Sequence, residues 1–380
     1  MPEIIFTGDL MCRPSMTEKT NQKYDIFFEK TDFSLRSADF TVGNLETPIA
    51  GEKLKYTYER YSFNTPESYV DALKKAGFNL LCLANNHIMD RGEQGILNTL
   101  ENCRKLGVDT VGAFKTANER DKIYVKNIGG IKVAFLNYTY GTNAFAHHRY
   151  LEHKYMVNLF QPEECKEGSV FLLNSYEQIA KATDEIYNKG ICYEFAKPYI
   201  EQLKDDIRRA RNESDFVVMI MHSGGQYNDM PEAYTESLVK IIKSSGADLI
   251  VGHHPHIIQK SSYSNGILTA YSLGNFLFST EDSKDMHIDP SGGMEIDINY
   301  SILLRLLLKK ENGTVKAEYA FDLMKVIEKD GLPIPINTYE LYEETGDDGL
   351  LSDIRFFVNR FAGKDIFRNI QRTYSLIGEQ

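Results

Sequence analysis

The 380-residue sequence lacks three features that would each point to a particular class of protein. Its five cysteines are odd in number and show no CxxC spacing, which favours a reducing compartment over a disulfide framework. No apolar run approaches the roughly 18–20 residues that cross a bilayer, since the best candidate, Ser301–Leu308, is short and contains Arg305. Positive charge is not in excess either: 54 acidic residues outnumber 43 basic ones, which argues against general binding of nucleic acid.

The first residues are not expected to form a secretory signal. Such a signal has a basic segment followed by a longer apolar one, whereas here Glu3 precedes a three-residue apolar stretch, Ile4–Phe6. We therefore expect a cytoplasmic protein that could still dock peripherally at a membrane. The composition, with 42% hydrophobic and 26% charged residues, is ordinary for a globular chain and excludes wholesale disorder.

Apolar runs that alternate with helical patterns predict an α/β fold. Buried strands are predicted at Asn79–Ala84, Phe216–Met221 and Leu249–Val251. Helices are predicted at Glu93–Leu106 and Pro198–Asn212, the first of which ends before a glycine. These segments predict a sheet-based domain with helices between the strands.

The pattern changes in the last third of the chain. Two long strands, Met294–Leu308 and Thr314–Leu323, are predicted to form a hairpin through an Asn-Gly turn. The acidic stretch Tyr339–Gly349 is predicted to be an exposed loop, and Leu351–Phe361 a helix. We place one domain over residues 1–300, with a helical insertion at about 142–200. Residues 301–380 are expected to complete the same domain.

Polar residues of few types follow the predicted strands. In open α/β sheets, functional groups gather beyond the carboxyl ends of the strands. Each residue alone has an ordinary explanation, such as a turn, a helix cap, a surface carboxylate or a buried histidine with a partner. Six such strand ends together are harder to explain separately, because buried charged and amide groups need partners. The residues are Asp9, Glu46, Asn85–His87, His222, His253–His256 and Asn275.

A shared metal centre would satisfy these groups together. Carboxylate, amide and imidazole ligands without thiolate suit Mn²⁺, Fe²⁺ or Zn²⁺. One tetrahedral zinc would not use all of these side chains, whereas two metals roughly 3.5–4 Å apart with a bridging carboxylate would. The pattern therefore predicts two divalent metal ions, whose usual task is the hydrolysis of phosphate esters.

Six short motifs occur in a fixed order along the chain: Phe6–Met11, Gly43–Glu46, Leu83–His87 with Asp90 and Gly92, Gly141–Asn143, Gly252–His256 and Tyr271–Phe276. In this order they resemble the CapA family, the poly-γ-glutamate capsule biosynthesis proteins, a branch of the calcineurin-like metallophosphoesterases. The resemblance extends from about Ile4 to Phe278. It implies a four-layer α-β-β-α sandwich of the metallophosphoesterase type, with a dinuclear metal site at one edge of two packed sheets.

The resemblance also implies roles for the site residues. Asp9 would bind the first metal, and Glu46 would bridge the two. His87 would protonate the leaving group or steady the transition state, and Asp90 would orient it. The other implied ligands are Asn86 and His222 for the second metal, and His254 and His256, one for each metal.

Departures from the family pattern bear on the substrate. Met11 stands where phosphoesterases of this superfamily usually have a ligand histidine. Ser223 and Gln226 replace a tryptophan and a glutamate that are common in the family, so a stacking platform and a carboxylate are missing or supplied elsewhere. His253 is an additional residue that we expect beside the ligands or facing the substrate, and Tyr227 is predicted to contact the substrate.

The insertion contains the strongly basic and aromatic patch of this acidic chain, between Phe145 and Tyr155. It is either a solvated, partly helical excursion or an anion-binding lid. In the second interpretation, Arg149 and Lys154 would meet phosphate or a polyanionic glutamate chain.

Two functions stay open at this point. One is a dinuclear-metal hydrolase that acts on a phosphoester or γ-glutamyl-type bond of an anionic small molecule or polymer, in the biosynthesis of a capsule or surface polyanion. The other is a non-catalytic assembly factor that binds the polymer in the same pocket. Met11 favours binding, whereas the set Asn86, His87 and Asp90 favours the enzyme. Membrane-associated capsule machinery is the partner that the resemblance implies.

Overall fold

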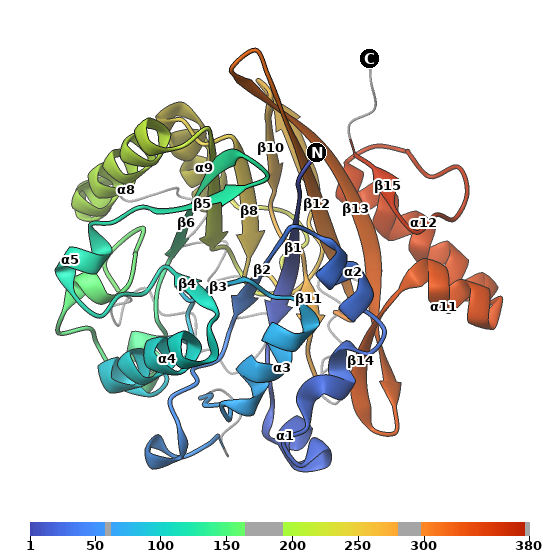
Figure 1. Cartoon of the computed structure of the whole chain (residues 1–380), viewed down its shortest axis with the longest axis horizontal. Coiled ribbons are helices and arrows are strands. Elements are labelled where there is room, and N and C mark those ends of the chain that lie inside the picture. Colours follow the sequence, from blue (N-terminus) through green and yellow to red (C-terminus); the bar gives the residue numbers. More distant parts are fainter. Residues whose placement is uncertain (58–61, 164–192, 280–297, 377–380) are drawn as a thin grey trace.

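The computed structural model describes residues 1–57, 62–163, 193–279 and 298–376 (Figure 1). Two mixed β-sheets form the centre of this part of the chain, and helices lie around them. The predicted α/β class is therefore confirmed. Among the described residues, no helix combines the length and the apolar character that crossing a membrane requires.

The first sheet has the order β14-β13-β12-β1-β2-β3-β4, with β11 added to β1 and β15 to β13. The strands from β1 to β4 run parallel, whereas β12 pairs with β1 in the antiparallel sense. The bounds are β1 Glu3–Leu10, β2 Phe40–Leu45, β3 Leu80–Cys82, β4 Asp109–Val111, β11 Asn275–Leu277, β12 Tyr300–Glu311, β13 Thr314–Lys329, β14 Leu332–Asn337 and β15 Tyr374–Ser375.

The second sheet has the order β5-β6-β7-β8-β10-β9. Its four central strands are parallel, and the two outer pairs are antiparallel hairpins. The predicted Gly129–Gly130 turn joins the first hairpin. The bounds are β5 Tyr124–Ile128, β6 Ile131–Thr139, β7 Phe216–His222, β8 Leu249–His253, β9 Ser261–Ser264 and β10 Ile267–Ala270.

Strand β7 shows why the central strands read as continuous apolar runs. Val218 and Ile220 belong to a buried cluster that also contains side chains of the first sheet, such as Phe6. The residues between them, Val217 and Met219, belong to a separate cluster with helices α8 and α9. Because successive side chains point to opposite faces, a strand covered on both faces is apolar at every position.

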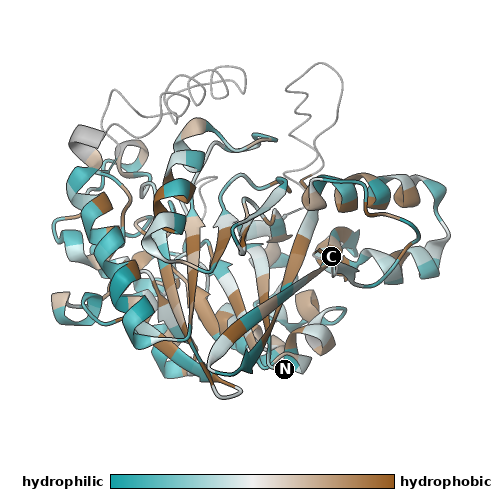
Figure 2. Ribbon diagram, turned by 90° about the horizontal axis from the view of Figure 1, so that it is seen from above, coloured by the Kyte–Doolittle hydropathy of each residue, from teal (hydrophilic) through white to brown (hydrophobic). Residues whose placement is uncertain are grey.

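Helices cover the outer faces of the sheets, and hydrophobic strands lie between them (Figure 2). On the first sheet, α1, α3 and α4 contribute to a buried cluster with the side chains of β1 and β3. The bounds are α1 Pro14–Thr20, α2 Asp32–Ser37, α3 Ser68–Ala76, α4 Gly92–Leu106, α5 Ala117–Arg120, α6 Ala144–His147, α8 Tyr193–Glu213, α9 Ala233–Ser245, α11 Thr338–Thr345 and α12 Asp348–Ala362, with short 3₁₀ helices η1 Tyr24–Phe28, η2 Glu52–Leu54 and η3 Lys154–Met156.

The acidic segment Tyr339–Gly349 was expected as a loop, and this prediction is wrong. Most of it forms helix α11, which lies beside β13 in Figure 1. The helix begins because the Asn337 side chain accepts a hydrogen bond from the Tyr339 backbone N–H at 2.8 Å, and it ends at Gly346, where φ is +62°. Capping therefore outweighs the acidic composition that suggested a solvated loop.

The C-terminal strands extend the first sheet directly. Glu3 of β1 lies opposite Leu307 of β12, and the predicted Asn-Gly hairpin joins β12 to β13. Strand β12 begins at Tyr300 rather than at Met294, which lies outside the described residues. Of the predicted insertion, the described part contains α6 and η3, whereas residues 164–192 lie outside it.

Candidate metal centre

The candidate metal centre forms where parallel strands of both sheets end. The register of β1 and β2 pairs Asp9 with Asn44, and Glu46 follows the last residue of β2. The register of β7 and β8 pairs His222 with His253. Nδ1 of His253 lies 2.9 Å from Oδ1 of Asp9, so the two sheets meet at this point through a direct polar contact.

Two groups of three side chains could each hold a metal ion. Glu46, His222 and His254 form one group, and Asp9, Glu46 and His256 form the other. Within each group, one candidate ligand atom from each residue lies within 4.8 Å of the others. All five residues are buried. Because Glu46 belongs to both groups, it is placed to bridge two ions.

Individual distances show how closely the groups converge on Glu46. Its Oε1 atom is 3.7 Å from Nε2 of His222 and 3.6 Å from Nε2 of His256. Nδ1 of His256 is 3.2 Å from Oδ2 of Asp9. Nε2 of His222 is also 2.8 Å from Oδ1 of Asn86, so Asn86 joins the first group at its edge.

Two buried atoms of the cluster have no hydrogen-bond partner, namely Oε1 of Glu46 and Nδ1 of His254. Leaving a buried polar atom without a partner costs about 1–3 kcal/mol, and more when the group is charged. Both atoms are of types that bind divalent cations. The residues present therefore fit a bound cation, which would satisfy both atoms at once.

The protonation of the cluster follows from its burial. Burial raises the pKa of Glu46, and the nearby charge of Asp9 raises it further. Burial also raises the pKa of Asp9, but hydrogen bonds with His253 and His256 outweigh this effect and hold the pKa well below its usual value. Burial, followed by neighbouring histidine charge, lowers the pKa values of His222 and His254. The imidazoles of His222 and His254 are thus neutral, as metal ligation requires.

The loop after β8 has an uncommon backbone. His254 and His256 have φ values of +99° and +60°, a region that residues other than glycine seldom adopt. Such strain persists where the surrounding structure enforces it, and it concentrates at functional sites. Here it allows both side chains of the His-Pro-His segment to reach the same cluster.

Asparagines that were quoted in the motifs, but given no role, hold the ligands in place. Nδ2 of Asn44 donates to Oδ1 of Asp9 at 2.8 Å and to Oε2 of Glu46 at 3.2 Å. Nδ2 of Asn86 donates to Oδ1 of Asn143 at 3.2 Å, which directs the oxygen of Asn86 toward the cluster. The signal for Asn44 and Asn143 was their place inside the motifs Gly43–Glu46 and Gly141–Asn143.

His253 and Asn275 each contact one member of the cluster. His253 lies against Asp9, as described above, and Oδ1 of Asn275 is 2.9 Å from Nδ1 of His256. Both therefore orient a candidate ligand. A contact between His253 and a substrate stays a prediction.

His87 and Asp90 form a buried pair beside the cluster. Nδ1 of His87 is 2.8 Å from Oδ2 of Asp90, and the same oxygen accepts a hydrogen bond from the Phe63 backbone N–H at 2.6 Å. The His87 backbone N–H donates to Oδ1 of Asn85 at 3.1 Å. On the other side of the carboxylate, Nε2 of His147 is 3.5 Å from Oδ1 of Asp90. Asp90 thus holds Nδ1 of His87, which leaves Nε2 for proton transfer.

The predicted substrate-binding residues are placed differently from one another. The ring of Tyr227 lies 5.9 Å from that of His256. Arg149 is exposed and donates to the backbone carbonyl of Asp90. Lys154 is exposed in η3, and within the described ranges we find no hydrogen bond or ion pair that joins it to the cluster. The structure therefore brings Tyr227 and Arg149 to the edge of the site, but not Lys154.

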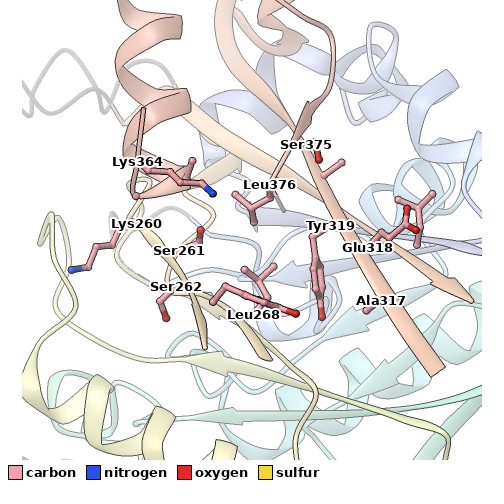
Figure 3. A pocket seen from close by; sticks show the side chains of 15 residues that line it. Lys260, Ser261, Ser262, Leu268, Ala317, Glu318, Tyr319, Lys364, Ser375 and Leu376 are labelled. Carbon is pink, nitrogen blue, oxygen red and sulfur yellow. The ribbon is translucent and has the colours of Figure 1, made fainter. Parts of the chain in front are cut away.

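A separate cleft of about 1110 Å³ lies between β9, β13 and the end of α12 (Figure 3). Tyr319 stands in it, and Lys364 extends over it from the segment after α12. None of the residues that line this cleft belongs to the candidate metal centre. Its lining lacks histidine, so the chemistry expected from the sequence is not located there.

Comparison with known proteins gives relatives over most of the chain. The capsule biosynthesis protein CapA of Bacillus anthracis is 31% identical over 304 residues, which cover 77% of this chain and 65% of that protein. The PGA biosynthesis protein CapA of Bacillus subtilis (strain 168) is 27% identical over 354 residues, which cover 92% of this chain and 78% of that protein. A hypothetical protein from Thermus thermophilus, with a TM-score of 0.35 and 13% identity over 88% of this chain and 97% of its own, is too distant to support an argument.

A family model gives the same result as the motifs. The model described as bacterial capsule synthesis protein PGA_cap matches residues 3–280, a range that contains every candidate ligand. The resemblance seen in the sequence is thereby confirmed. The chain belongs to the PGA_cap family of bacterial capsule synthesis proteins.

Proposed function

We propose that this protein is a hydrolase with two divalent cations, Mn²⁺, Fe²⁺ or Zn²⁺, that acts on a phosphoester or γ-glutamyl-type bond. The names of the two Bacillus relatives support a role in the biosynthesis of a capsule or another surface polyanion. The substrate is then an anionic small molecule or polymer. The protein works in the cytoplasm, where it docks at membrane-associated capsule machinery.

One observation carries the proposal. Two buried groups of ligand-type side chains share Glu46, and its Oε1 atom has no hydrogen-bond partner. A carboxylate shared between two groups is the arrangement that a pair of metals requires. The buried clusters on both faces of each sheet also support the four-layer sandwich in which such centres occur at one sheet edge.

The residues of the chain divide the work between binding and proton transfer. Asp9, Glu46 and His256 hold one cation, and His222, His254 and Asn86 complete the other position with Glu46. When bound, such a pair supplies a water molecule of lowered pKa and positive charge that stabilises a developing oxyanion.

The pair of His87 and Asp90 assists the leaving group. Nε2 of His87 carries the proton that the leaving group takes up, and Asp90 holds the imidazole in the orientation that this transfer needs. Arg149, Tyr227, Lys154 and His253 are the proposed substrate contacts. The first two already lie at the edge of the site.

The experiment combines elemental analysis with a chromogenic phosphodiester assay and a γ-glutamyl amide assay. The wild type is expected to hold about two equivalents of metal and to turn over one of the two substrates. Asp9→Ala and His256→Ala are expected to lose metal and activity together. Asp71→Ala, which changes an exposed carboxylate on α3, is the matched control and should alter neither. Full metal occupancy in both site variants would refute the assignment.

Met11 supports a second function, a binding factor without turnover. Its side chain packs with Phe63, Ile257, Phe278 and Ile298 in a small buried apolar cluster, so it adds no ligand to the centre. A centre with fewer ligands still binds an anionic polymer. Metal-loaded wild type that binds such a polymer but hydrolyses neither substrate would establish this function in place of the hydrolase.

A further inference from the structure

Arg13 is a buried cation beside the metal centre that the sequence did not single out. It follows β1, which carries Asp9, and directly precedes α1. Its side chain is only 7% exposed. Its guanidinium carbon lies 5.0 Å from the centre of the Phe63 ring and 5.7 Å from that of Phe278. A guanidinium between two aromatic faces is held in place by cation–π attraction.

These two rings connect Arg13 to the reacting groups. The Phe63 ring centre is 4.5 Å from that of His87, and Phe278 stacks on His256 with ring centres 6.4 Å apart. Arg13 therefore stands between the proton donor and one metal group. Burial raises the pKa of Glu46, and the charge of Arg13 opposes that rise, so the cation acts electrostatically on the cluster.

The chemistry of arginine indicates what this cation is for. A guanidinium presents a rigid fork of donors that matches two oxygens of a phosphate or carboxylate. Burying such a charge is costly, and cation–π contacts recover only part of the cost. A fixed positive charge next to a cation pair and a proton donor suits a substrate that carries negative charge near the bond to be cleaved.

We propose that Arg13 binds the oxyanion of the substrate at the cleavage site and thereby selects phosphoryl or carboxylate groups. This inference rests on the proposed function, since it assigns Arg13 to the same site. Arg13 is a specificity-determining residue in this scheme. It transfers no proton, and it is not expected to bind metal.

The test measures anion binding, which does not require turnover. Mn²⁺-loaded full-length wild type, Arg13→Gln and Arg13→Lys are titrated calorimetrically with inorganic phosphate and, separately, with a short γ-linked glutamate peptide. Arg13→Gln is expected to weaken binding about 10- to 100-fold, as the loss of a charge-assisted hydrogen bond predicts. Arg13→Lys keeps the charge but loses the fork, so a smaller loss is expected. The metal content should equal that of the wild type in both variants.

Two remote variants serve as controls. Arg372→Gln removes a guanidinium that pairs with Glu340 far along the chain, and Lys364→Gln removes a cation from the separate cleft of Figure 3. Both should bind the anions as the wild type does. If Lys364→Gln lost binding instead, the anion would occupy the separate cleft, and the inference would be wrong.

The outcomes separate this inference from the proposed function. Weakened anion binding in Arg13→Gln without hydrolysis by the wild type supports the inference and rejects the hydrolase. Hydrolysis by the wild type with unchanged anion binding in Arg13→Gln does the reverse. A wild type that binds neither anion overturns the inference. If Arg13→Gln does not fold, Arg13→Lys decides, because unchanged affinity of that variant for both anions would overturn the role of the fork.

Discussion

The carboxylate of Asp90 offers a sharp test of how this site is built, because its removal has a cost that follows from its partners. The side chain is fully buried. Oδ2 accepts hydrogen bonds from Nδ1 of His87 at 2.8 Å and from the Phe63 backbone N–H at 2.6 Å. Asp90→Ala removes the acceptor of both donors, whereas Asp90→Asn keeps one oxygen that can occupy the same place.

The expected magnitudes follow from counting these donors. A buried donor left without a partner costs about 1–3 kcal/mol, so Asp90→Ala should lower the free energy of unfolding by about 2–6 kcal/mol. Asp90→Asn retains the hydrogen bonds but loses the charge, which makes each bond weaker by about 1 kcal/mol. The asparagine variant should therefore be clearly more stable than the alanine variant. Its kcat should still fall, because a neutral amide orients and stabilises a protonated imidazole less well.

Urea unfolding of the metal-free proteins measures the stability differences, and the assay that detects wild-type turnover measures kcat. Asp71→Ala is the control, because Asp71 forms an exposed ion pair with Lys75 that should contribute no more than about 1 kcal/mol. An Asp90→Ala protein as stable as the wild type would refute the reasoning, since both donors would then have found other partners. Equal destabilisation by alanine and asparagine would show that charge, and not the hydrogen bonds, dominates.

Three further predictions test other parts of the molecule. Glu46→Ala should lower metal occupancy at both positions in elemental analysis, and Asn275→Ala, which contacts only a ligand-type histidine, should lower metal affinity less. His87→Ala should keep both metals while kcat falls about 10²–10⁴-fold, and loss of a metal from this variant would contradict the assignment. Arg305→Met should lower the free energy of unfolding by about 3–5 kcal/mol in urea, because the buried carboxylate of Asp322 loses its two-pronged partner. Unchanged stability of that variant would show that the ion pair contributes nothing.

The sequence by itself determined the class of the fold and the set of residues to watch. Strand β7 is apolar at every position before His222, and that pattern requires cover on both faces whatever the neighbouring elements are. Polar residues such as Asp9 and Glu46 at the ends of buried strands need partners, so their gathering at one sheet edge could be predicted without coordinates. Local turn chemistry likewise predicted the hairpin between β12 and β13.

Local pattern was a weaker guide where a single side chain decides the backbone. The acidic stretch after Asn337 reads as solvated, yet the hydrogen bond from the Tyr339 backbone N–H to the Asn337 side chain starts a helix there. The positive φ values at His254 and His256 are a similar case, because strand alternation predicts opposite faces for neighbours, and only this backbone turns both imidazoles to one cluster.

The roles of the residues around the ligands depended on the tertiary structure. Arg13 lies between a cysteine and a proline in the sequence, where nothing marks it, and it becomes part of the site only because Phe63 and Phe278 are brought to either side of it. His253 contacts Asp9 because β1 and β8 belong to different sheets whose ends meet. Hydrophobic periodicity fixes which face of an element is buried, but it carries no information about which distant element supplies the partner. That choice is made by the packing of the two sheets, and with it the arrangement of the whole site.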